Sequence, residues 1–223
     1  MRIPQLDIFA DFICPWCYLG IERLALALPM RGQFRPTIGW QAFQLMPEMP
    51  PGGMEHQQYT LLRYGSIERA ERVERFVREA MRELGTPYAM TPTQLVPPTD
   101  DAHRLAFYAA KRRRLLPMVG AVYRAYFAHG RDIADVAVLA DIAGAVGFDP
   151  VVVYDYLIGE EGFNQLLERE ILANEADIIA VPTFLFDRRY CLSGAQDPKS
   201  FLPLIDVSAL AVDQPGSAAQ TAP

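Results

Sequence analysis

The sequence contains few residues of the kinds that cross-link small secreted proteins or build metal clusters. Of its 223 residues, only three are cysteines and three are histidines. Three cysteines are too few for the disulfide framework of a small secreted scaffold. A chain of this length buries about 70% of the surface that its unfolded form exposes. Its core therefore needs neither disulfides nor a structural metal.

Excess positive charge and long hydrophobic runs are also missing. Lys and Arg number 21 against 27 Asp and Glu, so the net charge is −6. Because affinity for nucleic acid depends on cationic side chains, we expect no nucleic-acid partner. No apolar run approaches the roughly 18 residues of a membrane-spanning helix, and Asp7 and Asp11 interrupt any signal-peptide core. We expect a cytoplasmic protein with no membrane partner, and the basic run Lys111-Arg112-Arg113-Arg114 as a solvated helix face.

The two ends of the chain have the alternating pattern of strands, and the middle has the period of helices. Residues 6–10 and 38–42 alternate as strands do and flank a helix that begins at Pro15. Residues 183–186 and 190–192 predict two further strands, followed by a short helix. Between these ends, apolar residues recur at helical spacing over about 120 residues.

These patterns predict an α/β protein with a discontinuous domain. The strand-containing ends, residues 1–53 and 177–206, must share one sheet, because each would otherwise leave exposed edges. Residues 54–176 are predicted to form a helical insertion domain. Residues 207–223 are rich in Ala, Ser, Gln and Pro and predict a flexible tail.

The motif Cys14-Pro15-Trp16-Cys17 carries the strongest chemical signal. Two cysteines three residues apart on the first turn of a helix can close into a disulfide or open as a dithiol. The partial positive charge of the helix N-terminus favours a thiolate on Cys14. We expect Cys14 to be the accessible thiol, and Cys17, one turn further in, to be more buried and to react second.

A zinc half-site and a pair of inert structural cysteines are the alternatives for this motif. Zinc would require two more ligands, and no second close pair of cysteines or histidines exists. The candidates are scattered along the chain: Cys191, His56, His103 and His129. Cys191 is predicted to be a small buried residue of a strand.

A second signal is the sequence Val181-Pro182-Thr183, a proline directly before a predicted strand. A cis Val181–Pro182 bond would turn the chain there and leave neighbouring backbone groups free to bind an extended substrate. An ordinary loop proline is the alternative. Together with the two-cysteine motif, the pattern favours the cis bond.

Two further residues near the cysteines have more than one interpretation. Asp11 could exchange a proton near Cys17, or it could cap the helix that carries both cysteines. Trp16 is either a rigid platform for substrate or a lid on the sulfur atoms.

These features together resemble the DsbA-like thioredoxin-fold oxidoreductases, in particular the FrnE-like branch. The resemblance covers about residues 4 to 205 and is implied by four segments: Asp11-Phe12-Ile13-Cys14-Pro15-Trp16-Cys17-Tyr18-Leu19-Gly20, Ala102-His103-Arg104-Leu105, Val181-Pro182-Thr183-Phe184 and Ser193-Gly194-Ala195-Gln196. It implies a thioredoxin fold (βαβ…ββα) interrupted by a helical insertion domain, with Cys14 as nucleophile, Cys17 as resolving thiol and Pro182 in cis. Ala180 replaces a frequent Gly and Met46 an expected Asn, two departures that concern the substrate pocket.

The expected function is thiol–disulfide exchange through a mixed disulfide. Cys14 and Cys17 are the expected catalytic residues, and Pro15, Trp16, Val181 and Pro182 are expected to contact substrate. The partner is a thiol- or disulfide-containing protein or small molecule, and the chain is a monomer or homodimer. No metal or resident cofactor is expected beyond the Cys14–Cys17 disulfide, with glutathione a candidate co-substrate.

Two other function classes remain open at this point. One is a glutathione-dependent isomerase or transferase of the 2-hydroxychromene-2-carboxylate isomerase or kappa type, whose members use Ser at the position of Cys14. The other is a metal-binding module that uses the two cysteines as ligands.

Overall fold

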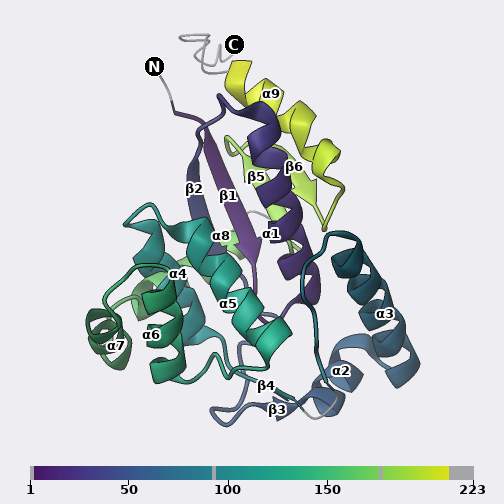
Figure 1. Cartoon of the computed structure of the whole chain (residues 1–223), viewed down its shortest axis with the longest axis vertical. Helices are drawn as coiled ribbons and strands as arrows, with labels where there is room; N and C mark the ends of the chain where they lie inside the picture. Colours follow the sequence, from purple (N-terminus) through teal and green to yellow (C-terminus); the bar gives the residue numbers. More distant parts are fainter. Residues whose placement is uncertain (1–2, 92–93, 176–177, 211–223) are drawn as a thin grey trace, which may run out of the picture.

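The computed structural model describes residues 3–91, 94–175 and 178–210 and centres on a four-stranded sheet (Figure 1). The strand order is β2-β1-β5-β6. β1 and β2 are parallel, whereas β5 runs antiparallel to β1 and β6 antiparallel to β5. The bounds are β1 Gln5–Ala10, β2 Thr37–Ala42, β5 Thr183–Phe186 and β6 Tyr190–Ser193. The strands from both ends of the chain therefore share one sheet, as the sequence predicts.

One face of this sheet is covered by the helix that carries the cysteines. Ile8 of β1 pairs with Phe184 of β5, and both side chains are completely buried. Helix α1 packs on this face, because a side chain at Gly20 would meet the Phe184 ring at 3.2 Å. The elements on this side are α1 Pro15–Ala27, the 3₁₀ turns η1 Leu28–Arg31 and η2 Pro198–Phe201, and α9 Leu202–Leu210 (Figure 1).

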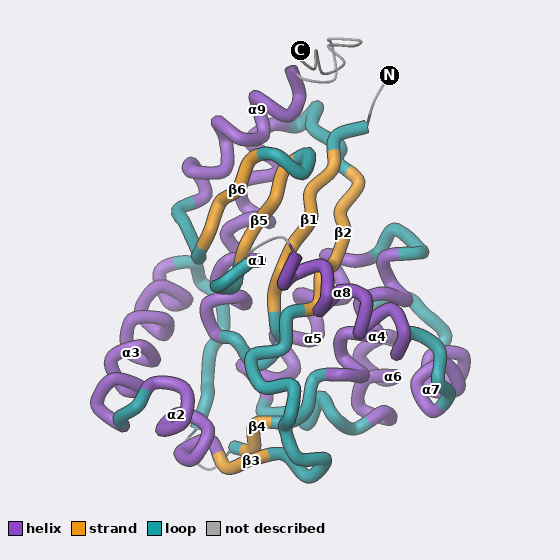
Figure 2. The backbone as a smooth tube through the Cα atoms, turned by 180° about the vertical axis from the view of Figure 1, so that it is seen from behind, coloured by secondary structure: helices purple, strands orange, loops and turns teal. Residues whose placement is uncertain are grey.

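The chain between β2 and β5 is mostly helical, as predicted. The helices labelled α2 and α3 lie on one side of the lower half, and those labelled α4 to α7 lie on the other. The last, α8, lies on the opposite face of the sheet from α1, beside β2 (Figures 1 and 2). The helices are α2 His56–Tyr64, α3 Ile67–Glu83, α4 Asp100–Ala110, α5 Leu115–His129, α6 Val136–Ala145, α7 Pro150–Ile158 and α8 Phe163–Glu175. A two-stranded antiparallel sheet of β3 Met54–Glu55 and β4 Leu95–Val96, which the sequence pattern does not predict, closes the lower end.

Residues with helix-ending chemistry fix the bounds of the insertion helices. The carboxylates of Asp135 and Asp149 accept hydrogen bonds from the first turns of α6 and α7. Gly130 ends α5 in the left-handed conformation that favours glycine. Thr99 precedes α4 but does not cap it with its side chain, since its hydroxyl accepts a hydrogen bond from Gln44 instead.

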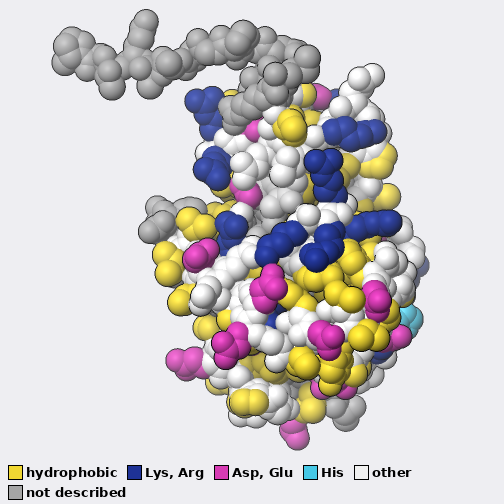
Figure 3. Space-filling view, turned by 90° about the vertical axis from the view of Figure 1, so that its left-hand side faces the viewer, with side chains coloured by type: hydrophobic (Ala, Val, Ile, Leu, Met, Phe, Trp, Pro, Cys, Tyr) yellow, Lys and Arg dark blue, Asp and Glu magenta, His cyan; other side chains and the backbone are white. Residues whose placement is uncertain are grey.

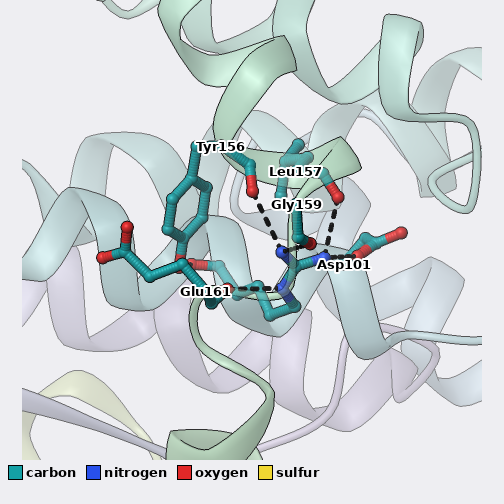
Figure 4. A network of polar contacts seen from close by, with 6 residues as sticks. Asp101, Tyr156, Leu157, Gly159 and Glu161 are labelled. Atoms are coloured by element: carbon teal, nitrogen blue, oxygen red, sulfur yellow. Dashed lines mark hydrogen bonds and ion pairs between the residues drawn. The ribbon is translucent and has the colours of Figure 1, made fainter.

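A buried arginine holds the turn between α7 and α8 in place (Figure 4). The Arg104 side chain is 1% exposed, and its guanidinium donates to the carbonyls of Tyr156, Leu157, Gly159 and Glu161. It also pairs with the Asp101 carboxylate at 2.5 Å and lies 4.0 Å from the Phe163 ring centroid. These contacts satisfy carbonyl groups at the end of α7 that have no partner within the helix.

Two expectations from the sequence are corrected here. Helix α9 continues through Leu210, so residues 207–210 are not tail; the buried Ser208 hydroxyl anchors them by donating to Asp187. Residues 211–223 and the predicted boundary at 176–177 lie outside the described residues. The run Lys111-Arg112-Arg113-Arg114 is exposed as expected, but it forms the turn after α4 because Arg113 adopts a φ of 57°.

One face of the molecule carries a band of basic side chains. In Figure 3, this band crosses the face that carries β2 and the α4–α7 group; most acidic side chains on this face lie below it among apolar ones, and a few lie above it. Within the part of the chain that the structure covers, no helix has the length and apolar character needed to cross a membrane.

Candidate active site

The two cysteines begin helix α1 directly after β1. Cys14 is the N-cap residue, and its Sγ accepts a hydrogen bond from the backbone N–H of Cys17 at 3.3 Å. Pro15 occupies the first helical position, where a missing N–H has no cost. Both cysteines are free thiols in this structure. The geometry combines a sulfur at a helix N-terminus with a second sulfur one turn away.

The expected accessibility of Cys14 is wrong. Cys14 is 3% exposed and Cys17 is 0% exposed, so both thiols are buried. Beside the Cys14 turn lies a cavity of about 20 Å³ lined by Ile13 and Pro15 together with residues of α2 and α3. The sequence pattern predicts α3, but neither the separate helix α2 nor the packing of both helices over the start of α1. The helical insertion therefore covers the start of α1 beside Cys14.

Three tyrosines that line this cavity have pKa values raised by burial and, in part, by the negative charge of an ionised Cys14. Burial, together with the Cys14 charge, raises the pKa of Tyr64 to about 12. The pKa values of Tyr59 and Tyr88 are raised further, mainly by burial. His56 Nε2 of α2 lies 3.0 Å from Glu74 Oε1 of α3, and both residues line the same cavity. Neutral phenols thus surround the approach to Cys14.

Cys17 is held as a thiol. Complete burial raises its pKa well above the usual value, and the hydrogen bond and charge of Cys14 raise it further. A hydrogen bond with the Asp11 backbone lowers this pKa, and the charge of Asp11, the smallest of these effects, raises it. Cys17 therefore keeps its proton at neutral pH.

The second motif meets the first, although 167 residues separate them. The Val181–Pro182 bond is cis, as predicted. The Cys14 Sγ lies 3.9 Å from the Val181 carbonyl oxygen, the outer limit of an S–H···O contact. The Pro182 carbonyl accepts a hydrogen bond from Gly194, which links this turn to the end of β6. Direct contact between the Pro182 ring and the two sulfurs stays a prediction.

Trp16 lies at the edge of the covering layer. Its side chain is half-buried and its ring centroid is 5.3 Å from that of Phe76 on α3, which is 58% exposed. The two rings form an apolar surface one residue away from Cys14. Pro15, beside it, is also half-buried.

Asp11 is buried behind the cysteines and does not cap α1. Its Oδ2 accepts a hydrogen bond from the Leu45 N–H at 2.7 Å, and its Oδ1 lies 3.3 Å from His103 Nε2. Its backbone carbonyl accepts hydrogen bonds from the Tyr123 hydroxyl and from the Cys14 N–H. The capping interpretation is wrong because Cys14 itself occupies the cap position, with its own sulfur as acceptor. The proton-exchange interpretation stays a prediction.

His103 and Trp40 complete a buried polar chain that the sequence did not reveal. Trp40 Nε1 lies 2.9 Å from His103 Nδ1, and both side chains are almost completely buried. The signal was present, since His103 belongs to a segment of the family resemblance. Its partner Asp11 lies 92 residues away, a pairing that only the folded chain shows.

The zinc alternative receives no support from the arrangement of ligands. No group of three or more His, Cys, Asp or Glu side chains within residues 3–91, 94–175 and 178–210 is placed to hold a metal ion. Cys191 is exposed, so its predicted burial is wrong. It lies on β6, an edge strand, and the order of strands cannot be read from its local sequence.

Comparison with known proteins places this site in a family. The protein YwbO of Bacillus subtilis is 24% identical over 188 residues, which span 81% of this chain and 86% of that protein. The crystal structure of a probable DsbA oxidoreductase from Streptomyces coelicolor shares 26% identity with a TM-score of 0.84, covering 98% of this chain and 94% of that chain.

A more distant structure shares the fold alone. A 2-hydroxychromene-2-carboxylate isomerase is 15% identical with a TM-score of 0.65, covering 93% of this chain and 95% of that chain. The model of the DSBA-like thioredoxin domain matches residues 5–206, which include both cysteines and the cis-proline turn. The chain belongs to the family of DsbA-like thioredoxin-domain proteins, and its fold is the thioredoxin-like fold with a helical insertion between strands.

Proposed function

We propose that the protein is a thiol–disulfide oxidoreductase that works through a mixed disulfide on Cys14. The observation that carries this proposal is the inequality of the two sulfurs. Cys14 accepts the Cys17 N–H at the helix N-terminus, whereas burial and neighbouring negative charge hold Cys17 as a thiol. A dithiol with one sulfur at the helix N-terminus and one protonated sulfur is suited to sequential exchange.

In the reducing direction, the Cys14 thiolate attacks one sulfur of a substrate disulfide. A Cys14–substrate disulfide forms and the other substrate sulfur leaves as a thiolate. Cys17 then loses its proton to water and attacks Cys14, which forms the Cys14–Cys17 disulfide and releases the second substrate thiolate. Two electrons pass from the pair to the substrate. The oxidising direction is the same sequence reversed.

The substrate is proposed to lie along the Val181 backbone and the Trp16 ring. The Val181 carbonyl is the backbone group found next to Cys14 Sγ, and Trp16 with Phe76 forms the neighbouring apolar surface. Burial of Cys14 favours a small thiol or disulfide, with glutathione the first to test, or a partner segment thin enough to enter beside α2 and α3. Membership of the FrnE-like branch is a part of this proposal that rests on the sequence segments alone.

A redox titration tests the proposal. The Cys191→Ser variant, which keeps only the motif cysteines, is equilibrated with glutathione buffers, and the remaining thiols are counted by mass spectrometry after alkylation. We expect a single two-electron transition with loss of two thiols. The Cys14→Ser/Cys191→Ser variant is the matched control and should form no internal disulfide.

The same samples separate the other function classes. A glutathione-dependent isomerase or transferase would bind glutathione without oxidation of the pair. A metal-binding module would copurify with stoichiometric metal and keep both thiols reduced. Either result, with no internal disulfide over the whole range of buffers, would refute the proposed function.

A further inference from the structure

Trp40, His103 and Asp11 form a hydrogen-bonded chain that ends next to the cysteine pair. Trp40 lies on β2, His103 on α4, and Asp11 follows β1. All three side chains are at most 2% exposed. The Phe12 ring packs on both the indole and the imidazole, with centroid distances of 5.1 Å to each. Water is therefore excluded from the chain, and its partners must satisfy one another.

The chemistry of Trp40 fixes the protonation of His103. An indole N–H can only donate, so His103 Nδ1, 2.9 Å away, must accept and carries no proton. A histidine with a bare Nδ1 is neutral and carries its one proton on Nε2. That proton points at Asp11 Oδ1, 3.3 Å away. Turning the ring over would place carbon atoms at both contacts, so the ring orientation is determined as well.

Asp11 receives donors on both of its oxygens. The Leu45 N–H donates to Oδ2 and the His103 Nε2–H donates to Oδ1, the pattern of an ionised carboxylate. Neither donor carries a net charge, so the negative charge of Asp11 is solvated but not cancelled. Asp11 contacts the cysteine motif through its backbone carbonyl, which accepts the Cys14 N–H at 3.2 Å, and its charge is the smallest of the effects that raise the pKa of Cys17.

We propose that Trp40 and His103 are positioning residues of the thiol site, in which Trp40 keeps His103 neutral so that Asp11 presents an uncancelled negative charge to Cys17 across the physiological pH range. This inference deepens the proposed function and rests on it. Two negative charges oppose ionisation of Cys17, those of Cys14 and Asp11. Once Cys14 is in a mixed disulfide it carries no charge, and only the Asp11 charge of these two remains. The chain therefore sets how fast Cys17 resolves the intermediate.

The other titratable groups around Asp11 do not respond in this pH range. The Asp11 charge reaches Cys17 of α1, Tyr59 of α2, and Tyr123 and Tyr126 of α5. Burial raises the pKa of each of these phenols, so all three stay neutral well above pH 8. His103 is the remaining ionisable side chain in direct contact with the Asp11 carboxylate.

The test replaces the indole donor. In Trp40→Phe, Nδ1 is free to take a proton, and the resulting imidazolium would cancel the Asp11 charge below about pH 6.5. Cancelling a neighbouring negative charge lowers a thiol pKa by about one unit, which raises the thiolate fraction about tenfold. Because a more acidic thiolate is a weaker nucleophile, the net gain in the rate of attack is only about threefold. We expect Cys17 to resolve the intermediate about threefold faster than in the parent at about pH 5.5, with equal rates at about pH 8.

The rate of resolution is read directly with an aryl disulfide whose released thiolate absorbs visible light. In stopped flow on a Cys191→Ser background, the first release reports attack by Cys14 and the second reports attack by Cys17. The variants are Trp40→Phe, His103→Gln and the double variant Trp40→Phe/His103→Gln. Glutamine accepts and donates like the neutral imidazole but does not titrate. The extra pH dependence should appear in Trp40→Phe alone and vanish in the double variant.

A second measurement needs no variant and no turnover. The ¹⁵N chemical shifts of the imidazole distinguish a bare nitrogen from a protonated one, and we expect His103 to keep a bare Nδ1 between about pH 5.5 and about pH 8. A protonated Nδ1 in this range would overturn the inference, as would identical pH profiles for Trp40→Phe and the parent. Absence of any second thiolate release in the parent would instead refute the proposed function and leave the assignment of the His103 proton standing.

Discussion

Gly20 is the point at which the cysteine helix touches the cis-proline turn, and Gly20→Ala should separate them. A Cβ built at Gly20 lies 2.8 Å from Pro182 Cγ and 3.2 Å from the Phe184 ring. Carbon atoms in contact prefer about 3.5 Å or more, so Pro182 must move by at least about 0.7 Å. The proline ring is closed onto the backbone and cannot rotate away, so the Val181 carbonyl moves with it.

The sizes of the opposing effects decide the outcome. Replacing glycine by alanine inside a helix stabilises a protein by about 0.5–1 kcal/mol, whereas overpacking a core costs about 1–3 kcal/mol. We expect Gly20→Ala to lose about 1 kcal/mol of unfolding free energy. Because Cys14 Sγ is already 3.9 Å from the Val181 carbonyl, the shift also disrupts the substrate-binding geometry. A misplacement of about 1 Å can reduce a rate by about 100-fold, so we expect a 10- to 100-fold slower exchange with glutathione disulfide.

Gly120→Ala is the matched control for this prediction. Gly120 lies inside α5, and a Cβ there would be 3.7 Å from the Arg124 guanidinium, an ordinary contact. We expect this variant to gain about 0.5–1 kcal/mol and to keep the parent rate. Stability is measured by urea unfolding and the exchange rate by stopped-flow fluorescence. If Gly20→Ala matched Gly120→Ala in both stability and rate, the contact between α1 and the Pro182 turn would have no functional role.

Three further predictions follow from burial and hydrogen bonding. Burial raises the pKa of Cys17 above its value in the unfolded chain, so above about pH 9 the unfolded chain ionises first and the reduced protein should lose about 1.4 kcal/mol of stability per pH unit. Urea unfolding at pH 9 and 10 should show a smaller loss of stability in Cys17→Ser than in the parent, and equal losses would contradict this. Arg104→Leu should cost about 3–5 kcal/mol because it removes the donor to four carbonyls, of which those of Tyr156 and Leu157 are in buried contacts. Lys111→Leu, which removes an exposed pair with Glu161, should cost at most about 1 kcal/mol; similar costs would count against the Arg104 network. Cys191→Ser should leave the exchange rate unchanged because this thiol lies exposed on β6, and a marked loss of rate would make it a third redox thiol.

Local patterns were sufficient for the framework of the fold. Alternation in residues 6–10 and 38–42 marked the parallel strands, and Pro15 marked the start of α1. The proline before residues 183–186 pointed to the cis bond. Each of these signals acts within a few residues, where steric and hydrogen-bonding rules are strongest.

What the sequence did not reveal depends on contacts between distant segments. The burial of Cys14 follows from the packing of α2 and α3, whose own sequences do not specify what they cover. The exposure of Cys191 follows from the position of β6 at the sheet edge. The contact between Asp11 and His103 joins residues that lie 92 positions apart, and the extension of α9 depends on the contact from Ser208 to Asp187.

The most direct test of the central claim, that Cys14 attacks and Cys17 resolves, is trapping of the intermediate. Reduced Cys17→Ser and Cys14→Ser, both on the Cys191→Ser background, are mixed with glutathione disulfide, quenched with acid and weighed by intact-mass spectrometry. We predict that Cys17→Ser accumulates one glutathione adduct on Cys14, because no second thiol can displace it. Cys14→Ser should remain unmodified, because Cys17 is completely buried and its raised pKa keeps it protonated. Equal trapping by the two variants, or trapping by Cys14→Ser alone, would contradict the account.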